Sequence, residues 1–152
     1  MSKITISRRF EWDAAHRIPG HEGACKAIHG HRYVAEVEVS GPDLDPLGRV
    51  VDFGVLKQDL GAWIDTHFDH TAIFSRADAD VADIARLNEA MGRPVYWLDG
   101  APTAERIVTE LARIIPPLLA PHGITLESVK LWETPNCWAL WRRTVDSVGR
   151  SG

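Results

Sequence analysis

Hydrophobic and polar residues alternate in two stretches near the N-terminus. In the first, from Ile4 to His16, every second residue lies on one mostly apolar face: Ile4, Ile6, Arg8, Phe10, Trp12, Ala14 and His16. The alternation returns from Tyr33 to Val39. A period of two residues is typical of a strand with one buried side. We therefore predict two strands that pair antiparallel across the intervening loop.

The period then changes to that of a helix. Apolar residues recur three or four positions apart from Val55 to Phe68, and Asp52 precedes them as the predicted N-cap. A second, shorter helix is predicted from Asp80 to Met91, with Gly92 as its stop. The segment 94–98 is predicted to be a short extended piece.

A third helix is predicted to begin at Thr103, its N-cap, and to bury Ile107, Val108, Leu111, Ile114 and Ile115. Pro116 and Pro117 are expected to end or kink it. Residues 128–133 and 138–145 follow as a predicted β-hairpin. Strands at both ends with helices between them predict an α+β fold, an antiparallel sheet with helices on one face.

Composition narrows the class of protein. The chain has 152 residues, a net charge of −4, and 45% hydrophobic residues, which suits one domain spanning residues 1–152. It lacks an apolar run of transmembrane length, and its N-terminus lacks the apolar core of a secretory signal. The acidic balance argues against nucleic acid or a membrane as partner. With only Cys25 and Cys137 as thiols, we expect a cytoplasmic protein.

The most informative stretch contains His29 and His31, close to Cys25. In extended chain both imidazoles point to the same side, and His16 ends the preceding strand on its apolar face. Strand pairing would bring three imidazoles together, the ligand set of a catalytic zinc site with an open fourth position. Cys25 as a fourth ligand would instead close the site, and histidines at such spacing often bind no metal. Spacing alone leaves these alternatives open.

Three acidic residues are further candidates. Asp69 precedes His70, and a carboxylate beside an imidazole supports acid–base chemistry. Adjacent residues rarely orient each other directly, so the alternative is a histidine at a helix C-terminus beside a solvated aspartate. Glu133 falls on an apolar strand face, where it either binds a guanidine-like ligand edge or reaches solvent at the strand end. Glu105 is predicted to lie in the first turn of the helix that begins at Thr103. The helix dipole favours a negative charge there, which explains this residue without a role in a site.

Six motifs occur in an order that resembles the 6-pyruvoyl-tetrahydropterin synthase / 6-carboxy-tetrahydropterin synthase family. They are Ala14-Ala15-His16, Cys25-X3-His29-Gly30-His31-X-Tyr33, Val51-Asp52-Phe53, Phe68-Asp69-His70, Pro102-Thr103-Ala104-Glu105 and Leu131-Trp132-Glu133-Thr134-Pro135. The resemblance runs from about Phe10 to Trp141 and implies a tunnelling fold (T-fold), with a four-stranded antiparallel sheet and helices on one face. It also implies homotrimers or homohexamers with active sites at subunit interfaces.

The resemblance implies three sets of site residues. The zinc ligands match His16, His29 and His31. The catalytic thiol and its acid–base partners match Cys25, Asp69 and His70. The positions near the pterin match Glu133, Thr103 and Glu105, of which Glu133 would anchor the aminopyrimidinone edge.

The short spacing between Cys25 and His29 resembles the bacterial 6-carboxy-5,6,7,8-tetrahydropterin synthase branch. The implied reaction converts 7,8-dihydroneopterin triphosphate to 6-carboxytetrahydropterin, acetaldehyde and triphosphate on the route to queuosine. The alternatives are 6-pyruvoyl-tetrahydropterin synthase and a zinc- and pterin-binding protein without turnover. Three features depart from the family pattern: Arg106 in place of Asn, Ile73-Phe74 in place of Leu-Asn, and a longer segment from Ser75 to Gly100.

Overall fold

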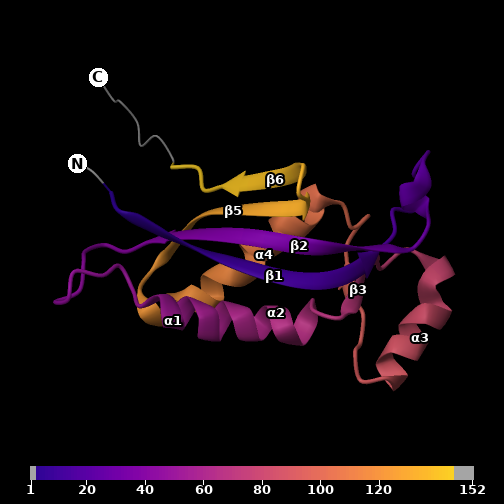
Figure 1. Cartoon of the computed structure of the whole chain (residues 1–152), viewed down its shortest axis with the longest axis horizontal. Helices are drawn as coiled ribbons and strands as arrows, with labels where there is room; N and C mark the ends of the chain where they lie inside the picture. The colour runs from indigo at the N-terminus through magenta and orange to yellow at the C-terminus, as the bar shows by residue number, and fades with distance from the viewer. Residues whose placement is uncertain (1–2, 146–152) are drawn as a thin grey trace.

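The computed structural model describes residues 3–145, which form a mixed sheet of six strands in the order β4-β3-β1-β2-β5-β6 (Figure 1). The strands β1 (Thr5–His16) and β2 (His29–Ser40) pair antiparallel over their full lengths, as predicted. The strand β5 (Thr125–Thr134) pairs with β2, and β6 (Cys137–Arg142) completes the predicted hairpin at one edge.

The expectation of a four-stranded, purely antiparallel sheet is wrong, because two further strands lie beyond β1. The strand β3 (Thr71–Ser75) runs parallel to β1 and pairs only with Ala14–His16, and β4 (Tyr96–Leu98) runs parallel to β3. All residues of β3 are buried, so it shows no alternation and the period-two pattern misses it. The strand β4 confirms the predicted extended piece.

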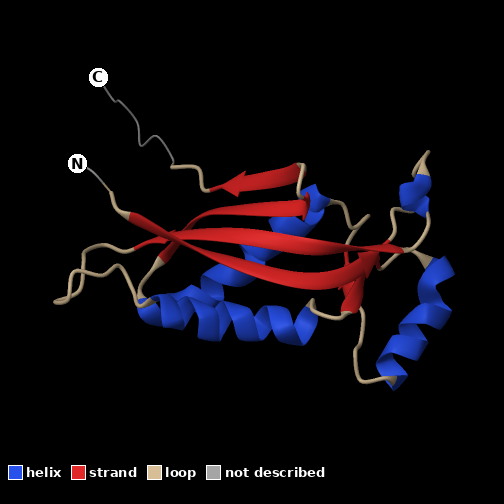
Figure 2. Ribbon diagram, in the orientation of Figure 1, coloured by secondary structure: helices blue, strands red, loops and turns tan. Residues whose placement is uncertain are grey.

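Three helical segments cover one face of the sheet, which confirms the predicted α+β layering (Figure 2). The segments α1 (Phe53–Leu56) and α2 (Ala62–His67) are joined by a π-helical turn, η2 (Lys57–Gly61), into one helical run. Asp52 caps this run as predicted, because its carboxylate accepts a hydrogen bond from the Gly54 amide at 2.7 Å.

The third covering helix, α4 (Ala104–Leu119), begins at the predicted cap Thr103, whose hydroxyl accepts from the Arg106 amide at 3.3 Å. Pro116 and Pro117 do not end it, since helical geometry continues to Leu119. The buried side chain of Leu119 packs in the core, which favours this extra turn. A 3₁₀ turn, η4 (Ala120–His122), follows.

The helix α3 (Ala82–Ala90) stands at the end of the sheet, beside β3 (Figure 1). It confirms the helix predicted over 80–91, begins after the 3₁₀ turn η3 (Ala79–Val81), and is followed by Gly92 at a φ of 76°. Its predicted apolar stripe is not buried as a whole. Val81 is fully buried, whereas Leu87 is 53% exposed and Met91 72% exposed.

The core lies between the covering helices and the sheet. Trp12 of β1 faces Tyr33 of β2 across the strand pair, and the two rings stack with centroids 5.6 Å apart. Phe68 packs against Trp12 from the end of α2. This packed layer gives the adjoining ends of β1 and β2 a fixed geometry. Within residues 3–145, none of the helices combines the length and apolarity that a membrane span requires.

Candidate active site

Three imidazoles meet where β1 ends and β2 begins. His16 is the direct register partner of His29, and His31 lies opposite Ala14, so alternation places all three rings on the helix-facing side. Their ring centroids lie 4.5 to 5.0 Å apart, and one ligand nitrogen from each falls within 4.8 Å of the others. The sequence prediction that strand pairing gathers these histidines is confirmed.

Backbone carbonyls orient two of the rings. The Nδ1 atom of His16 lies 2.8 Å from the Pro102 carbonyl, and that of His29 lies 2.8 Å from the Ala27 carbonyl. Because a carbonyl only accepts, each Nδ1 carries the hydrogen and each Nε2 carries a lone pair. These two Nε2 atoms face each other at 3.0 Å. Two lone pairs so close repel each other unless a cation lies between them.

Burial favours the neutral form of His16 and His31. His16 is fully buried, and loss of hydration lowers its pKa to about 4. Burial also lowers the pKa of His31, against the opposing influence of Glu133. The His31 Nε2 atom is buried without a hydrogen-bond partner within the described part of the chain. Neutral imidazoles with unshared nitrogen lone pairs fit a divalent transition metal such as zinc.

Cys25 lies in the loop between the two strands, in the 3₁₀ turn η1 (Ala24–Lys26), and is half-buried. The Ile18 amide donates to the Cys25 carbonyl at 2.8 Å, which ties the turn to the end of β1. The thiol is not among the ligand atoms that lie within 4.8 Å of one another. This geometry favours the three-nitrogen set over a site closed by Cys25.

Asp69 and His70 contact each other directly, with Oδ2 and Nδ1 2.7 Å apart. The alternative of a histidine beside a solvated aspartate is therefore wrong. The reason is local, because His70 adopts a left-handed φ of 58°, which turns its ring back to the preceding carboxylate. The other carboxylate oxygen accepts from the Asp13 amide at 3.1 Å. Burial works against ionisation of Asp69, but these two hydrogen bonds prevail and lower its pKa.

Glu133 lies on the face predicted for it, two positions after the fully buried Leu131. Its Oε1 atom is 3.8 Å from the His31 Nε2, and its side chain is 23% exposed. Glu133 also lines a groove of about 510 Å³, together with Arg32 and Glu36 from the sheet face opposite the histidine rings. Glu133 is thus both close to the histidine cluster and accessible to solvent. The two alternatives drawn from the sequence, a ligand-binding carboxylate and a strand-end residue in solvent, each describe only part of this position.

The start of α4 reaches the histidine cluster through its backbone. Thr103 caps the helix, and Glu105 in the first turn is exposed. The neighbouring Pro102 carbonyl is the group that orients His16. Sequence reasoning missed Pro102 and Ala27 as orienting residues, because their carbonyls carry no side-chain signal. Tyr33, fully buried beside His31, was predicted on the apolar face of the second strand and as part of a motif, without a role in the site.

The sheet, the covering helices and the histidine cluster together define a T-fold protein with a candidate metal centre. The chain belongs to the 6-pyruvoyl tetrahydropterin synthase family, whose model matches residues 5–144. It is 40% identical over 136 residues to the 6-carboxy-5,6,7,8-tetrahydropterin synthase of Rickettsia bellii, covering 89% of this chain and 97% of that protein. The Haemophilus influenzae protein of the same name is 35% identical over 142 residues, covering 90% and 97%.

Solved structures support the fold. A Wolinella succinogenes protein superimposes with a TM-score of 0.81 at 21% identity, covering 95% of this chain and all of that one. The 6-pyruvoyl tetrahydropterin synthase of Caenorhabditis elegans superimposes with a TM-score of 0.64 at 24% identity, covering 95% and 98%. At these sequence identities the structural similarity supports the fold alone.

Proposed function

We propose that this chain is a 6-carboxy-5,6,7,8-tetrahydropterin synthase, a lyase that acts on 7,8-dihydroneopterin triphosphate. The observation that carries the proposal is the set of three clustered imidazoles, one buried and two half-buried, with two facing lone pairs, in a chain whose relatives of that name match almost end to end. The products are 6-carboxytetrahydropterin, acetaldehyde and triphosphate, on the route to queuosine, and the enzyme works in the cytoplasm.

Zinc is the proposed cofactor, held by His16, His29 and His31. Bound there, it supplies Lewis acidity toward the side-chain hydroxyls of the substrate. The carbonyls of Pro102 and Ala27 keep the ligand nitrogens aimed at one point, as outer contacts of metal-bound histidines commonly do.

Proton transfer is assigned to three residues. Cys25 acts as the base toward the side-chain carbons. His70 takes up and returns the proton at its exposed ring edge. Asp69 holds the His70 ring by the contact at Nδ1 and stabilises its charged form, because its own pKa is low enough to keep it ionised at neutral pH.

Pterin recognition is assigned to Glu133, with Thr103 and Glu105 contributing near the pocket. A carboxylate can accept two hydrogen bonds from the 2-amino group and ring N–H of the pterin, a charge-assisted pairing. The Glu133 side chain is 23% exposed, so a ligand can reach its carboxylate. We further propose one domain per chain and a homotrimer or homohexamer with interface active sites, so that one copy's residues complete another's site.

The test is incubation of the zinc-loaded protein with 7,8-dihydroneopterin triphosphate. Release of both acetaldehyde and a 6-carboxypterin is expected. Triphosphate release without acetaldehyde would instead identify a 6-pyruvoyl-tetrahydropterin synthase. Tight pterin binding with no product would indicate a binding protein without turnover.

A further inference from the structure

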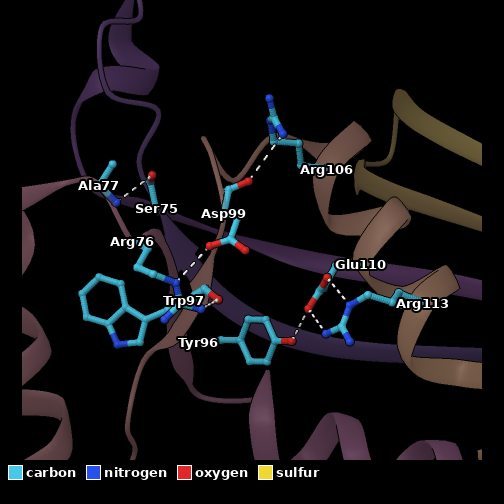
Figure 3. Close-up of polar contacts among 9 residues, drawn as sticks. All are labelled: Ser75, Arg76, Ala77, Tyr96, Trp97, Asp99, Arg106, Glu110 and Arg113. Atoms are coloured by element: carbon cyan, nitrogen blue, oxygen red, sulfur yellow. Dashed lines mark hydrogen bonds and ion pairs between the residues drawn. The ribbon is translucent and has the colours of Figure 1, made fainter. Parts of the chain in front are cut away.

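A second cavity lies outside the candidate active site, between the edge strand β4 and the outer face of α4 (Figure 3). Its volume is about 500 Å³. Its walls include two features that depart from the family pattern, the longer segment 75–100 and the arginine at position 106, and are completed by Thr109, Glu110 and Arg113 of α4. The proposed reaction uses neither feature, so the cavity needs its own explanation.

Three arginines line this cavity, Arg76, Arg106 and Arg113, against two carboxylates, Asp99 and Glu110. The Arg76 Nε donates to Asp99 at 3.0 Å, and Arg113 donates to Glu110 at 2.6 and 3.0 Å. Arg106 forms no ion pair with a carboxylate among residues 3–145. Its Nη1 reaches only the backbone carbonyl of Asp99, at 3.4 Å. The lining therefore has one more positive charge than negative.

Gly100 makes room for the Arg106 guanidinium. It has a φ of 107°, a conformation that favours glycine, and it directly follows Asp99. A Cβ atom added at this position would lie 2.8 Å from Cζ of Arg106 and 2.9 Å from two of its nitrogens. Any other residue would push the guanidinium away from the loop, so the absence of a side chain determines where this charge sits.

The two ion pairs, Arg113 with Glu110 and Arg76 with Asp99, differ in how readily an incoming anion can displace the carboxylate from its arginine. Glu110 accepts from Arg113 and from the Tyr96 hydroxyl at 2.5 Å, and its side chain is only 18% exposed. The pair between Arg76 and Asp99 is open to water, with side chains 64% and 90% exposed. Such exposed pairs contribute little free energy. An anion can therefore displace Asp99 from Arg76 while Glu110 keeps its partners.

We propose that this cavity binds an oligophosphate anion through Arg76 and Arg106, with Arg113 at its far end. Guanidinium groups pair with phosphate oxygens in a two-pronged geometry that ammonium groups cannot match. Arg106 and Arg113 are seven residues apart on α4, a rise of about 10 Å along the helix, which suits a chain of phosphates better than a single one. The inference does not depend on the reaction proposed above.

The test is calorimetric titration of the full-length protein with inorganic triphosphate and, separately, with ATP, at about 0.15 M salt. Saturable binding of at least one of them is expected. We expect Arg106→Gln and Arg76→Gln each to weaken it by about tenfold, the effect of losing one charge-assisted contact. Gly100→Ala should weaken it while keeping every charge. The control is Arg86→Gln, which removes an arginine from α3 outside the cavity and should leave the affinity unchanged.

The comparison between the two ligands identifies the source of the phosphate chain. Tighter binding of ATP points to a nucleotide, and tighter binding of inorganic triphosphate to a free oligophosphate. Failure of both ligands to bind the unmodified protein would overturn the proposal, as would equal affinities for Arg106→Gln and Arg86→Gln. Loss of binding in His29→Gln, with the fold intact by circular dichroism, would place the anion at the histidine cluster and equally overturn it.

Discussion

The Nε2 atoms of His16 and His29 face each other at 3.0 Å, from directly paired positions of β1 and β2. The strand register fixes this separation, and two carbonyls fix the tautomers. A cation between these two nitrogens would be bound by both lone pairs. Because a ligand that binds only the folded state stabilises it, metal binding and folding stability should be coupled.

His29→Ala should therefore abolish zinc binding. The unmodified protein is expected to hold about one zinc ion per chain, with a thermal midpoint that rises on zinc addition. The variant should hold nearly none, and its midpoint should not respond to zinc. Metal analysis and a thermal melt check both points. His122→Gln, which alters a histidine that contacts Asp59 outside the cluster, is the control. Full zinc content in His29→Ala would refute the ligand assignment.

Cys25→Ala should keep zinc and lose turnover. Removing a catalytic base commonly lowers the rate by about 10²- to 10⁴-fold. Because three imidazoles suffice as protein ligands, the zinc content should stay unchanged. Cys137→Ala, at the exposed cysteine of β6, is the matched control and should keep full activity. If Cys25→Ala loses its zinc instead, the thiol is a ligand and the open fourth position does not exist.

Asp69→Asn should slow turnover, because it weakens the support that Asp69 gives to the charged form of His70. An amide cannot stabilise the charged imidazole as a carboxylate does, so kcat should fall by about tenfold or more while KM changes little. Steady-state kinetics with metal analysis separates this effect from loss of zinc. The control is Asp65→Asn on the exposed side of α2. A rise in KM at constant kcat would assign Asp69 to substrate binding.

Glu133→Gln should weaken pterin binding by about 1.5–3 kcal/mol, the range for hydrogen bonds to a charged group. Neopterin titrated into the zinc-loaded protein measures the change directly. Glu89→Gln on α3 removes an acidic group from an exposed helix and serves as the control. Equal neopterin affinities for the two variants would show that Glu133 does not anchor the pterin.

Glu110 should make folding stability depend on pH. Hydrogen bonds from Arg113, and then from Tyr96, outweigh its burial and hold its pKa below the ordinary 4.5. A carboxyl with a depressed pKa in the folded state contributes stability above its unfolded pKa and loses it as the pH falls through the folded value. Below about pH 4.5 the free energy of unfolding of Glu110→Gln should therefore fall less steeply.

Urea unfolding at a series of pH values measures this slope. Glu89→Gln controls for the change in net charge. Parallel slopes for the unmodified protein and Glu110→Gln would mean that the Glu110 contacts do not persist in solution.

Local patterns predicted most of the elements, whereas the complete sheet depends on long-range pairing. Alternation identified β1 and β2, and side-chain caps marked α1 and α4, because these signals lie within a few residues. The strand β3 is buried on both faces, so its sequence carries no alternation. Its parallel pairing with β1 depends on the crossover through α1 and α2, which no local pattern encodes.

The candidate site likewise combines residues that the sequence could predict with contacts that it could not. The histidine cluster was predictable because residue spacing and antiparallel pairing together place three side chains on one face. The contact between Asp69 and His70 was not, since it depends on a left-handed backbone at His70 that is unusual for a residue other than glycine. The Pro102 carbonyl was also hidden, because a backbone atom that orients a ligand leaves no mark on the sequence.

The short pairing between β3 and β1 has a consequence for the behaviour of a single chain. Only Ala14–His16 of β1 bond to β3, so within the described chain one row of backbone amides and carbonyls from Thr5 to Trp12 has no strand beside it. Open strand edges of this length invite strand addition and aggregation. The ring of subunits proposed above would cover this edge, so a chain that is prevented from assembling should aggregate more readily than one that assembles.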